Sequence, residues 1–297
     1  MFRTFDDIEK YVLENGIVKK IALCGAHDEP ALSAVVDAVR KGVASAVLIG
    51  DEKGIREILA DMGEDADNYE IINMPEETDS AAQAIKMVKA GEADIPMKGL
   101  MQTATYMRAI LNKETGILPA GRTLSECTPF EYKDGNRFMF VTDCAVNITP
   151  DLEGKVKIIN NAVELAEKFG IEDIKVAALS AVEKVNEKIP SSVDAAQLAE
   201  MEWDNCTVEG PFALDNAVSE EAAAHKGIGG KVAGKADILL ASDLGMGNVI
   251  HKGLNYFAHT RTAGALCGTE HPVILTSRTD TADSKYNSIL VAILQSL

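Results

Sequence analysis

The chain has 297 residues, of which 46% are hydrophobic and 25% charged, and its formal net charge is −17. This composition is typical of a globular protein with one large domain or two ordinary ones, and it excludes a mainly disordered chain. The negative charge argues against nucleic acid as a partner, because duplex binding needs a basic surface. No apolar run approaches the roughly 20 residues that cross a bilayer, and the acidic N-terminal segment is not typical of a signal peptide. We therefore expect a cytoplasmic protein without a membrane partner.

Cysteine and histidine spacing gives no metal-binding pattern. The cysteines are scattered and none has CxxC spacing, which predicts reduced thiols in a cytosolic core. His251 and His259 lie two turns apart on a predicted helix, too far for one ion. The sequence therefore predicts no metal site.

The first part of the chain alternates between predicted strands and helices with short loops. Strands are predicted at 19–24, 46–49, 69–72 and 93–97. Helices are predicted from Pro30 to about Lys41, at 77–90 and at 103–111. This alternation predicts βαβ units, a parallel sheet and an α/β fold.

The pattern changes in the middle of the chain. Segments 122–132 and 137–142 flank the turn sequence 133–136 and predict an antiparallel hairpin, which a loop and a helix at 151–169 follow. The βα alternation then resumes, with strands at 174–179, 206–210 and 236–241 and helices at 193–202 and around Lys252.

The end of the chain predicts a buried strand at 273–276 and a helix from about Ala282. One apolar face of this helix would carry Ile289, Leu290, Ile293 and Leu294, with Asp280 or Thr281 as the N-cap.

Polar residues lie between this strand and this helix, where an open α/β sheet binds its ligands. The helix N-terminus favours an anion there, and Arg278 could hold a phosphate through two parallel hydrogen bonds. The alternative is a capped junction in which Arg278 pairs with a neighbouring carboxylate. The pattern alone favours neither interpretation.

Other candidate residues follow predicted strands. Lys98 and Arg108 are two cations of one strand–helix unit, which could meet a phosphate or an acyl oxygen or simply be solvated. Asn248 and Lys252 lie one helical turn apart after a Gly-rich loop.

Asp215 and Ser219 also lie one turn apart and could line one helix face or merely cap a helix. Asp143 and Asn147 occupy the loop after the hairpin. No GxGxxG, Walker A, GxSxG or HExxH motif occurs, so the chemistry must come from such loop residues.

Several stretches carry a family resemblance over nearly the whole chain. They are Lys98-Gly99 with Thr103, Asp143 with Asn147 and Pro150, GPFALDNAVS ending at Ser219, VAGKADILLASDLGMGN ending at Asn248 with Lys252, and PVILTSRTDT from Pro272. With these motifs the chain resembles the phosphate acetyltransferase/phosphate butyryltransferase family, and is closest to its butyryl branch.

The resemblance implies an isocitrate/isopropylmalate dehydrogenase-like fold with two α/β domains and a cleft between them. One domain would be discontinuous, formed by 1–142 and 271–297, and the other would cover 143–270. Family members are homodimers or larger. They transfer an acyl group reversibly between coenzyme A and inorganic phosphate, so the substrates would be acyl-CoA, phosphate and acyl phosphate, with no metal or other cofactor.

The resemblance also implies residue roles. Ser277 and Arg278 match the Ser-Arg pair of the family's phosphate site, and Arg108 matches an arginine near coenzyme A or phosphate. The pair Asn248 and Lys252 matches an Asn–Lys pair after the Gly-rich turn. The residues Asp215 and Ser219 match cleft residues of the butyryl branch, and Lys98, Thr103, Asp143 and Asn147 complete the predicted substrate-binding set.

One position departs from the acetyl branch, in which an aspartate six residues beyond the arginine is the proposed base for the thiol. Here that position is Ser284, which leaves Asp280 or Asp283 as the base. A carboxylate helps because a thiol with a pKa of about 8.5 is mostly protonated at neutral pH.

The predicted mechanism is direct transfer in a ternary complex: phosphate attacks the thioester carbonyl, and in reverse the thiolate attacks the acyl phosphate. Arg278 would neutralise the phosphoryl group, and Ser277, Lys98 or a backbone N–H would stabilise the carbonyl oxygen. The alternatives are an acetyl-specific enzyme, a nicotinamide-dependent dehydrogenase on the same fold, and a non-catalytic protein that binds coenzyme A or acyl phosphate.

Overall fold

The computed structural model describes residues 1–132, 137–277 and 279–297. The chain divides into two compact α/β units. Unit 1 comprises Met1–Thr4 and Thr123–Thr262, and unit 2 comprises Phe5–Arg122 and Ala263–Leu297. The predicted division placed the hairpin in the other domain. The reason for the difference is strand pairing, because the second hairpin strand continues directly into the sheet of unit 1.

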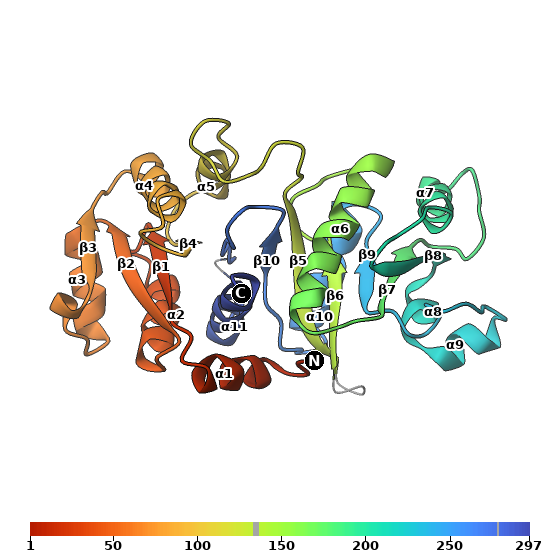
Figure 1. Cartoon of the computed structure of the whole chain (residues 1–297), viewed down its shortest axis with the longest axis horizontal. Helices are drawn as coiled ribbons and strands as arrows, with labels where there is room; N and C mark the ends of the chain where they lie inside the picture. Colours follow the sequence, from red (N-terminus) through yellow and green to blue (C-terminus); the bar gives the residue numbers. More distant parts are fainter. Residues whose placement is uncertain (133–136, 278) are drawn as a thin grey trace. The chain divides into compact units, whose positions relative to one another are not determined.

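Unit 2 contains a parallel sheet with the strand order β3-β2-β1-β4 (Figure 1). Its strands are β1 (Lys19–Cys24), β2 (Ala44–Gly50), β3 (Glu70–Asn73) and β4 (Ile95–Lys98). They alternate with α2 (Glu29–Arg40), α3 (Glu52–Asp61) and α4 (Glu77–Lys89), and η1 (Ala66–Asn68) precedes β3. Because β2 and β4 lie on opposite sides of β1, the loops after β1 and β4 flank a topological switch point, where such sheets bind ligands.

Glycines let the loops after β1 and β4 touch. The Gly99 amide donates to the Cys24 carbonyl over 2.8 Å, and the Leu100 amide donates to the Gly25 carbonyl over 2.9 Å. A Cβ on Gly99 would lie 2.3 Å from the Gly25 oxygen, so only glycine fits there.

The C-terminal helix α11 (Ala282–Gln295) is enclosed rather than amphipathic. All residues from Ser284 to Leu294 are buried, so burial includes the predicted apolar face and extends well beyond it. The helix packs against both α1 (Phe5–Glu14) and α2, as well as β10 (Ala265–Cys267), and neighbours on several sides leave little of its surface to solvent.

The predicted strand before α11 is reduced to isolated bridges. Ile274 pairs with Met97 in parallel and Val273 pairs with Leu266 in antiparallel fashion. Helix α5 (Thr103–Ile110) follows β4 close to the predicted position.

Unit 1 contains a mixed sheet in which the strands β5-β6-β9-β7-β8 are neighbours in that order (Figure 1). They are β5 (Ser125–Tyr132), β6 (Arg137–Thr142), β7 (Ile174–Leu179), β8 (Cys206–Phe212) and β9 (Ile238–Leu240). The pair β5–β6 is antiparallel as predicted, and the other pairs are parallel. The helices are α6 (Leu152–Lys168), α7 (Pro190–Ala199), α8 (Leu214–Val218), α9 (Glu220–His225) and α10 (Leu244–Tyr256).

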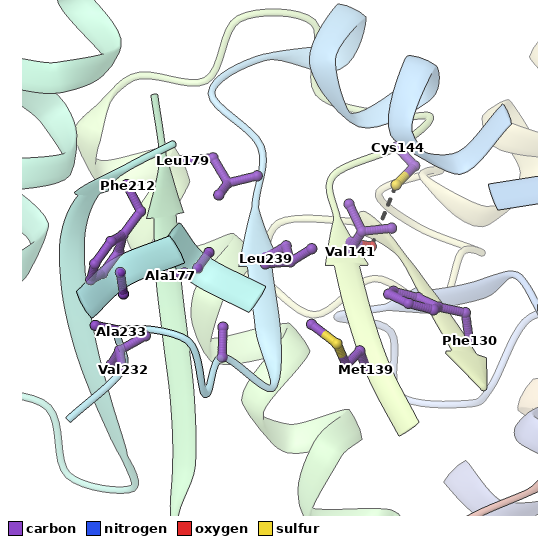
Figure 2. Packing of buried hydrophobic residues seen from close by; sticks show 13 residues of the cluster. Phe130, Met139, Val141, Cys144, Ala177, Leu179, Phe212, Val232, Ala233 and Leu239 are labelled. Atoms are coloured by element: carbon purple, nitrogen blue, oxygen red, sulfur yellow. Dashed lines mark hydrogen bonds between the residues drawn. The ribbon is translucent and has the colours of Figure 1, made fainter. Parts of the chain in front are cut away.

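The sheet of unit 1 has buried residues on both faces. On one face Met139 and Val141 of β6 join Leu239 of β9 in an apolar cluster (Figure 2). On the other, Phe138 and Phe140 meet the ring of Phe169 edge to face, with centroids 4.7 and 5.0 Å apart. Burial on both faces explains the continuous apolar runs of these strands. Within the described residues, none of the helices is long and apolar enough to cross a bilayer.

Candidate active site

The carboxyl end of β4 and the segment before α11 lie side by side in unit 2. The Lys98 amide donates to the Ile274 carbonyl over 3.1 Å, and the neighbouring Met97 bridges Ile274 in parallel. Because parallel segments end at the same edge, Lys98 and the loop that begins at Ser277 emerge together. This pairing joins two predicted site elements that are far apart in the sequence.

The loop from Ser277 to Asp280 is closed by hydrogen bonds within it. The Ser277 amide donates to Oδ2 of Asp280 over 2.7 Å, and the Asp280 amide donates to the Ser277 carbonyl over 3.2 Å. The Ser277 hydroxyl is exposed and lies 3.1 Å from that of Thr279. Arg278, the predicted phosphate ligand, lies outside the described residues.

Helix α11 begins directly after this loop. Thr281, one of the two predicted N-caps, is the N-cap of α11, because its hydroxyl accepts the Ser284 amide at 3.1 Å. The Asp283 carboxylate is exposed on the first turn and accepts a hydrogen bond from the Asn287 amide group over 2.9 Å. Both predicted base candidates are therefore near the helix N-terminus, but only Asp280 is built into the loop.

A buried lysine beneath the loop was not predicted. The Lys285 side chain is 2% exposed, and its ammonium donates to the Asp280 carbonyl over 2.5 Å. Burial lowers the pKa of this ammonium, and the negative charges of Asp280 and Asp28 oppose that shift. Its position in a helical run of apolar residues gave no signal of this contact.

Lys98 is also buried, at 4% exposure, with its ammonium 3.2 Å from the Gly99 carbonyl. Thr103 is the first residue of α5, and Arg108 lies in its last turn; both side chains are exposed. Lys98 thus belongs to the packed edge, whereas Thr103 and Arg108 face solvent in this unit.

In unit 1, the Asp143 carboxylate organises the loop after β6. It is 3% exposed and accepts the amides of Ala145, Val146 and Asn147 at 2.8, 3.0 and 3.1 Å. The Asn147 side chain donates to the same carboxylate over 2.5 Å and to the Leu124 carbonyl over 2.9 Å. Asp143 therefore acts here as a scaffold that orders a predicted binding loop.

Helix α10 packs directly on this loop. A Cβ on Gly247 would lie 2.0 Å from the Asp143 carbonyl oxygen, so a glycine is required. The Asn248 side chain donates to the Cys144 carbonyl over 3.4 Å, and Lys252 lies one turn further along the helix. The loop and helix α10 thus bring Asp143, Asn147, Asn248 and Lys252 into one region, as the adjacent strands β6 and β9 dictate.

Helix α10 begins at a strong cap. The Asp243 carboxylate accepts the Met246 amide at 3.0 Å and the Ser242 hydroxyl at 2.7 Å. These hydrogen bonds lower the pKa of Asp243.

Asp215 and Ser219 make a separate set of contacts at the end of β8. Asp215 pairs with the Lys226 ammonium at 3.0 Å, and this bond lowers the pKa of the carboxyl group. The Ser219 hydroxyl caps α9 by accepting the Ala222 amide at 3.2 Å. The Ser219 contact therefore matches the capping alternative, and Asp215 is paired with Lys226.

Comparison with known proteins places this arrangement in a family. A family model described as phosphate acetyl/butaryl transferase matches residues 76–293. The chain is 45% identical to the phosphate butyryltransferase of Clostridium acetobutylicum, over 99% of this chain and 98% of that enzyme. It is 38% identical to the phosphate acetyltransferase of Thermotoga maritima, over 96% of this chain and 98% of that enzyme.

A solved structure agrees with these matches. The crystal structure of a branched-chain phosphotransacylase from Enterococcus faecalis superimposes with a TM-score of 0.85 at 32% identity, over 94% of this chain and 99% of that one. The fold and its relatives thus define an enzyme of the acyltransferase class. More narrowly, the chain belongs to the phosphate acetyl/butaryl transferase family, as its motifs predicted.

Proposed function

We propose that this enzyme transfers a short-chain acyl group reversibly between coenzyme A and inorganic phosphate, with butyryl or a similar chain as the preferred group. The observation that carries the proposal is the pairing of β4 with the segment before α11, which brings Lys98 and the Ser277 loop to one sheet edge. The family match supports the reaction class.

We assign phosphate to the loop between Ser277 and Asp280. Its exposed hydroxyl and the adjacent N-terminus of α11 provide hydrogen-bond donors and a favourable dipole for an anion. The buried ammonium groups of Lys98 and Lys285 add positive charge at this edge of a strongly acidic protein. Arg278 would complete the site as the residue that neutralises the phosphoryl group.

The base that we propose is Asp283. The Asp280 carboxylate accepts the Ser277 amide and so holds the loop closed, whereas Asp283 is exposed on the first turn of α11. A carboxylate at this position can take the proton of the coenzyme A thiol as its sulfur attacks the carbonyl carbon of the acyl phosphate; the C–O bond then breaks and phosphate leaves. In the other direction phosphate attacks the thioester carbonyl, the C–S bond breaks, and the proton returns to the thiolate.

We assign the ordered loop of Asp143 and Asn147, together with Asn248 and Lys252 of α10, to coenzyme A. The Lys252 ammonium is a point charge suited to a phosphate of the nucleotide part, and the amide groups of Asn147 and Asn248 can orient polar atoms. Arg108 and Thr103 of α5 are the other proposed contacts. Other expectations also stay proposals. They are the substrate-binding roles of Asp215 and Ser219, the isocitrate/isopropylmalate dehydrogenase-like fold with its cleft, a cytoplasmic location, a homodimeric state and a reaction that needs no metal or other cofactor.

The direct test is an acyl-CoA chain-length series in which thiol release is measured with and without phosphate. We expect release only when phosphate is present, with a higher kcat/KM for butyryl-CoA than for acetyl-CoA. One methylene in an apolar pocket is worth about 1–3 kcal/mol, so the enzyme can use both substrates. The ratio of the two kcat/KM values therefore decides between a butyryl-specific and an acetyl-specific enzyme. Phosphate-independent release, or a requirement for a nicotinamide cofactor, would exclude the proposed reaction.

A variant tests the site separately from the reaction. Replacing Arg278→Ala should raise the phosphate KM and lower kcat by about 10²-fold or more, because one donor to a developing charge is worth about 2.7–4 kcal/mol. Normal kinetics in this variant would refute the phosphate assignment while leaving the reaction intact.

A further inference from the structure

Three potential metal ligands from separate segments converge within unit 1. They are the carboxylate of Glu126 in β5, the thiol of Cys144 after β6 and the imidazole of His251 in α10, and their ligand atoms all lie within 4.8 Å of one another. The sequence gave no signal of this cluster, because the three residues have no common motif spacing.

Strand pairing and helix packing explain the convergence. Cys127 pairs with Thr142, so the preceding Glu126 lies opposite the start of the loop that carries Cys144. Helix α10 packs on that loop through Gly247, which places His251 one turn further along the helix over the same point. The ligands are therefore held by the backbone of three different elements.

The cluster is mostly buried. Glu126 is 5% exposed and Cys144 is fully buried, while His251 is partly exposed and so gives an ion a path from solvent. The hydroxyl of Thr128 donates to Oε1 of Glu126 over 3.0 Å, an outer contact of the kind that orients a metal-binding carboxylate. In Figure 2 the Cys144 thiol points back toward β6, where it lies 3.4 Å from the Val141 carbonyl.

The chemistry of the ligand set selects a borderline cation. Thiolate, imidazole and carboxylate are the ligands of Zn²⁺, and three protein ligands with a water in the fourth position form a common zinc geometry. Ligand atoms around a tetrahedral zinc lie about 3.3–3.8 Å apart, given bonds of about 2.0–2.3 Å. Side-chain movements of about 1 Å therefore suffice to close the cluster on an ion.

We propose that Glu126, Cys144 and His251 bind a zinc ion, with a water in the fourth position, and that this ion fixes α10 to the loop after β6. On binding, a Zn–S bond forms and the thiol proton leaves to solvent, with no change of oxidation state. Because Asn248 and Lys252 flank His251 on α10, the ion would hold the proposed coenzyme A contacts in position without touching the substrates. The site does not depend on the proposed function, which needs no metal.

The test uses the full-length protein stripped with a chelator and titrated with Zn²⁺ against a chromophoric competitor. We expect one zinc per chain, and a higher melting temperature with zinc than without. Loading with Co²⁺ should give the near-ultraviolet charge-transfer band of a thiolate-bound ion, a readout that does not depend on activity.

Matched variants identify the ligands. Cys144→Ser should abolish the charge-transfer band. Both Cys144→Ser and His251→Gln should lower zinc affinity by about 100-fold or more, because even the loss of an outer contact to a metal ligand costs about 10–100-fold. The controls are Cys206→Ser, which changes a half-buried thiol elsewhere in unit 1, and His225→Gln at the exposed end of α9. Both should bind zinc like the wild type, and circular dichroism confirms that each variant is folded.

Three results would overturn the proposal. One is a wild-type protein that takes up no zinc above the background of Cys144→Ser. Another is a charge-transfer band that survives in Cys144→Ser, which would place the ion at another thiol. The third is equal zinc affinity in His251→Gln and His225→Gln.

Discussion

The Ser277 amide donates to Oδ2 of Asp280 over 2.7 Å, and the Asp280 amide donates to the Ser277 carbonyl over 3.2 Å. This reciprocal pair closes the loop at the proposed phosphate site. The Asp280 carboxylate therefore has a structural role in the loop, which a catalytic base does not need. The two candidate bases can therefore be separated by how each tolerates an amide in place of its carboxylate.

Asp280→Asn should retain most activity, because the amide oxygen still accepts the Ser277 amide. Asp280→Ala removes the acceptor and should raise the phosphate KM by about tenfold, the effect of about 1.4 kcal/mol from one lost hydrogen bond. Steady-state kinetics with varied phosphate measure both. Equal and severe losses of kcat in the two variants would instead identify Asp280 as the base.

Asp283→Asn should lower kcat by about 10²–10⁴-fold in the direction that consumes the coenzyme A thiol, because general-base catalysis is lost. The KM for acyl phosphate should change little, since the carboxylate acts on the thiol. Asp79→Asn, which changes an acidic residue in the first turn of α4, is a matched control and should leave kcat unchanged. Unchanged kcat in Asp283→Asn contradicts the assignment.

Two glycines of the same helix provide a matched pair for the packing of α10. Gly247→Ala would place a methyl group 2.0 Å from the Asp143 carbonyl oxygen, whereas Gly253→Ala meets nothing within 4 Å. Gly247→Ala should cost about 1–3 kcal/mol and raise the coenzyme A KM, because the helix must move away from the loop. Gly253→Ala should be neutral or stabilise the fold by about 0.5–1 kcal/mol.

Urea unfolding followed by the fluorescence of Trp203, the single tryptophan of the chain, reports on unit 1. If both alanine variants unfold at the same urea concentration, the close approach of Gly247 to Asp143 does not exist in solution.

The cap of α10 should make stability depend on pH in the acid range. The pKa of Asp243 is lowered in the folded state by hydrogen bonds from Ser242 and Met246, so the unfolded chain binds more protons just below pH 3.9. The stabilisation is complete above about pH 3.9, the unfolded value, and is lost as the pH falls through the lower folded value.

Asp243→Ala should therefore cost about 1 kcal/mol at neutral pH and less at low pH, where the carboxyl group is protonated in both states. Urea midpoints of wild type and variant across the acid range measure this difference. If the difference between the two urea midpoints is the same at every pH, the charge of the Asp243 carboxylate contributes nothing to stability.

The strands and helices were largely predictable because their patterns are local. The βα alternation of the first part and the hairpin of β5 and β6 were predicted within a few residues. The prediction of the final strand at 273–276 was wrong in extent, because Val273 and Ile274 form only isolated bridges. Bridging depends on partners such as Met97 and Leu266, which a local pattern does not contain.

The sequence located the polar residues of the candidate site in loops and at helix starts, but not their contacts. A motif locates Asp280 and Ser219 near a helix start. Tertiary structure shows that Asp280 closes a loop and decides that Ser219 caps α9, which the sequence offered as one of two alternatives. Lys285 gave no signal, because a lysine in an otherwise apolar helix usually faces solvent.

Sequence alone determined the α/β class, the family and the loops that carry polar residues, because periodicity, turn residues and motifs are local properties of the chain. Tertiary structure alone decided that α11 is enclosed, that Gly247 must be a glycine and that Glu126, Cys144 and His251 meet. Each of these depends on which distant segments become neighbours, and that follows from strand order and helix packing.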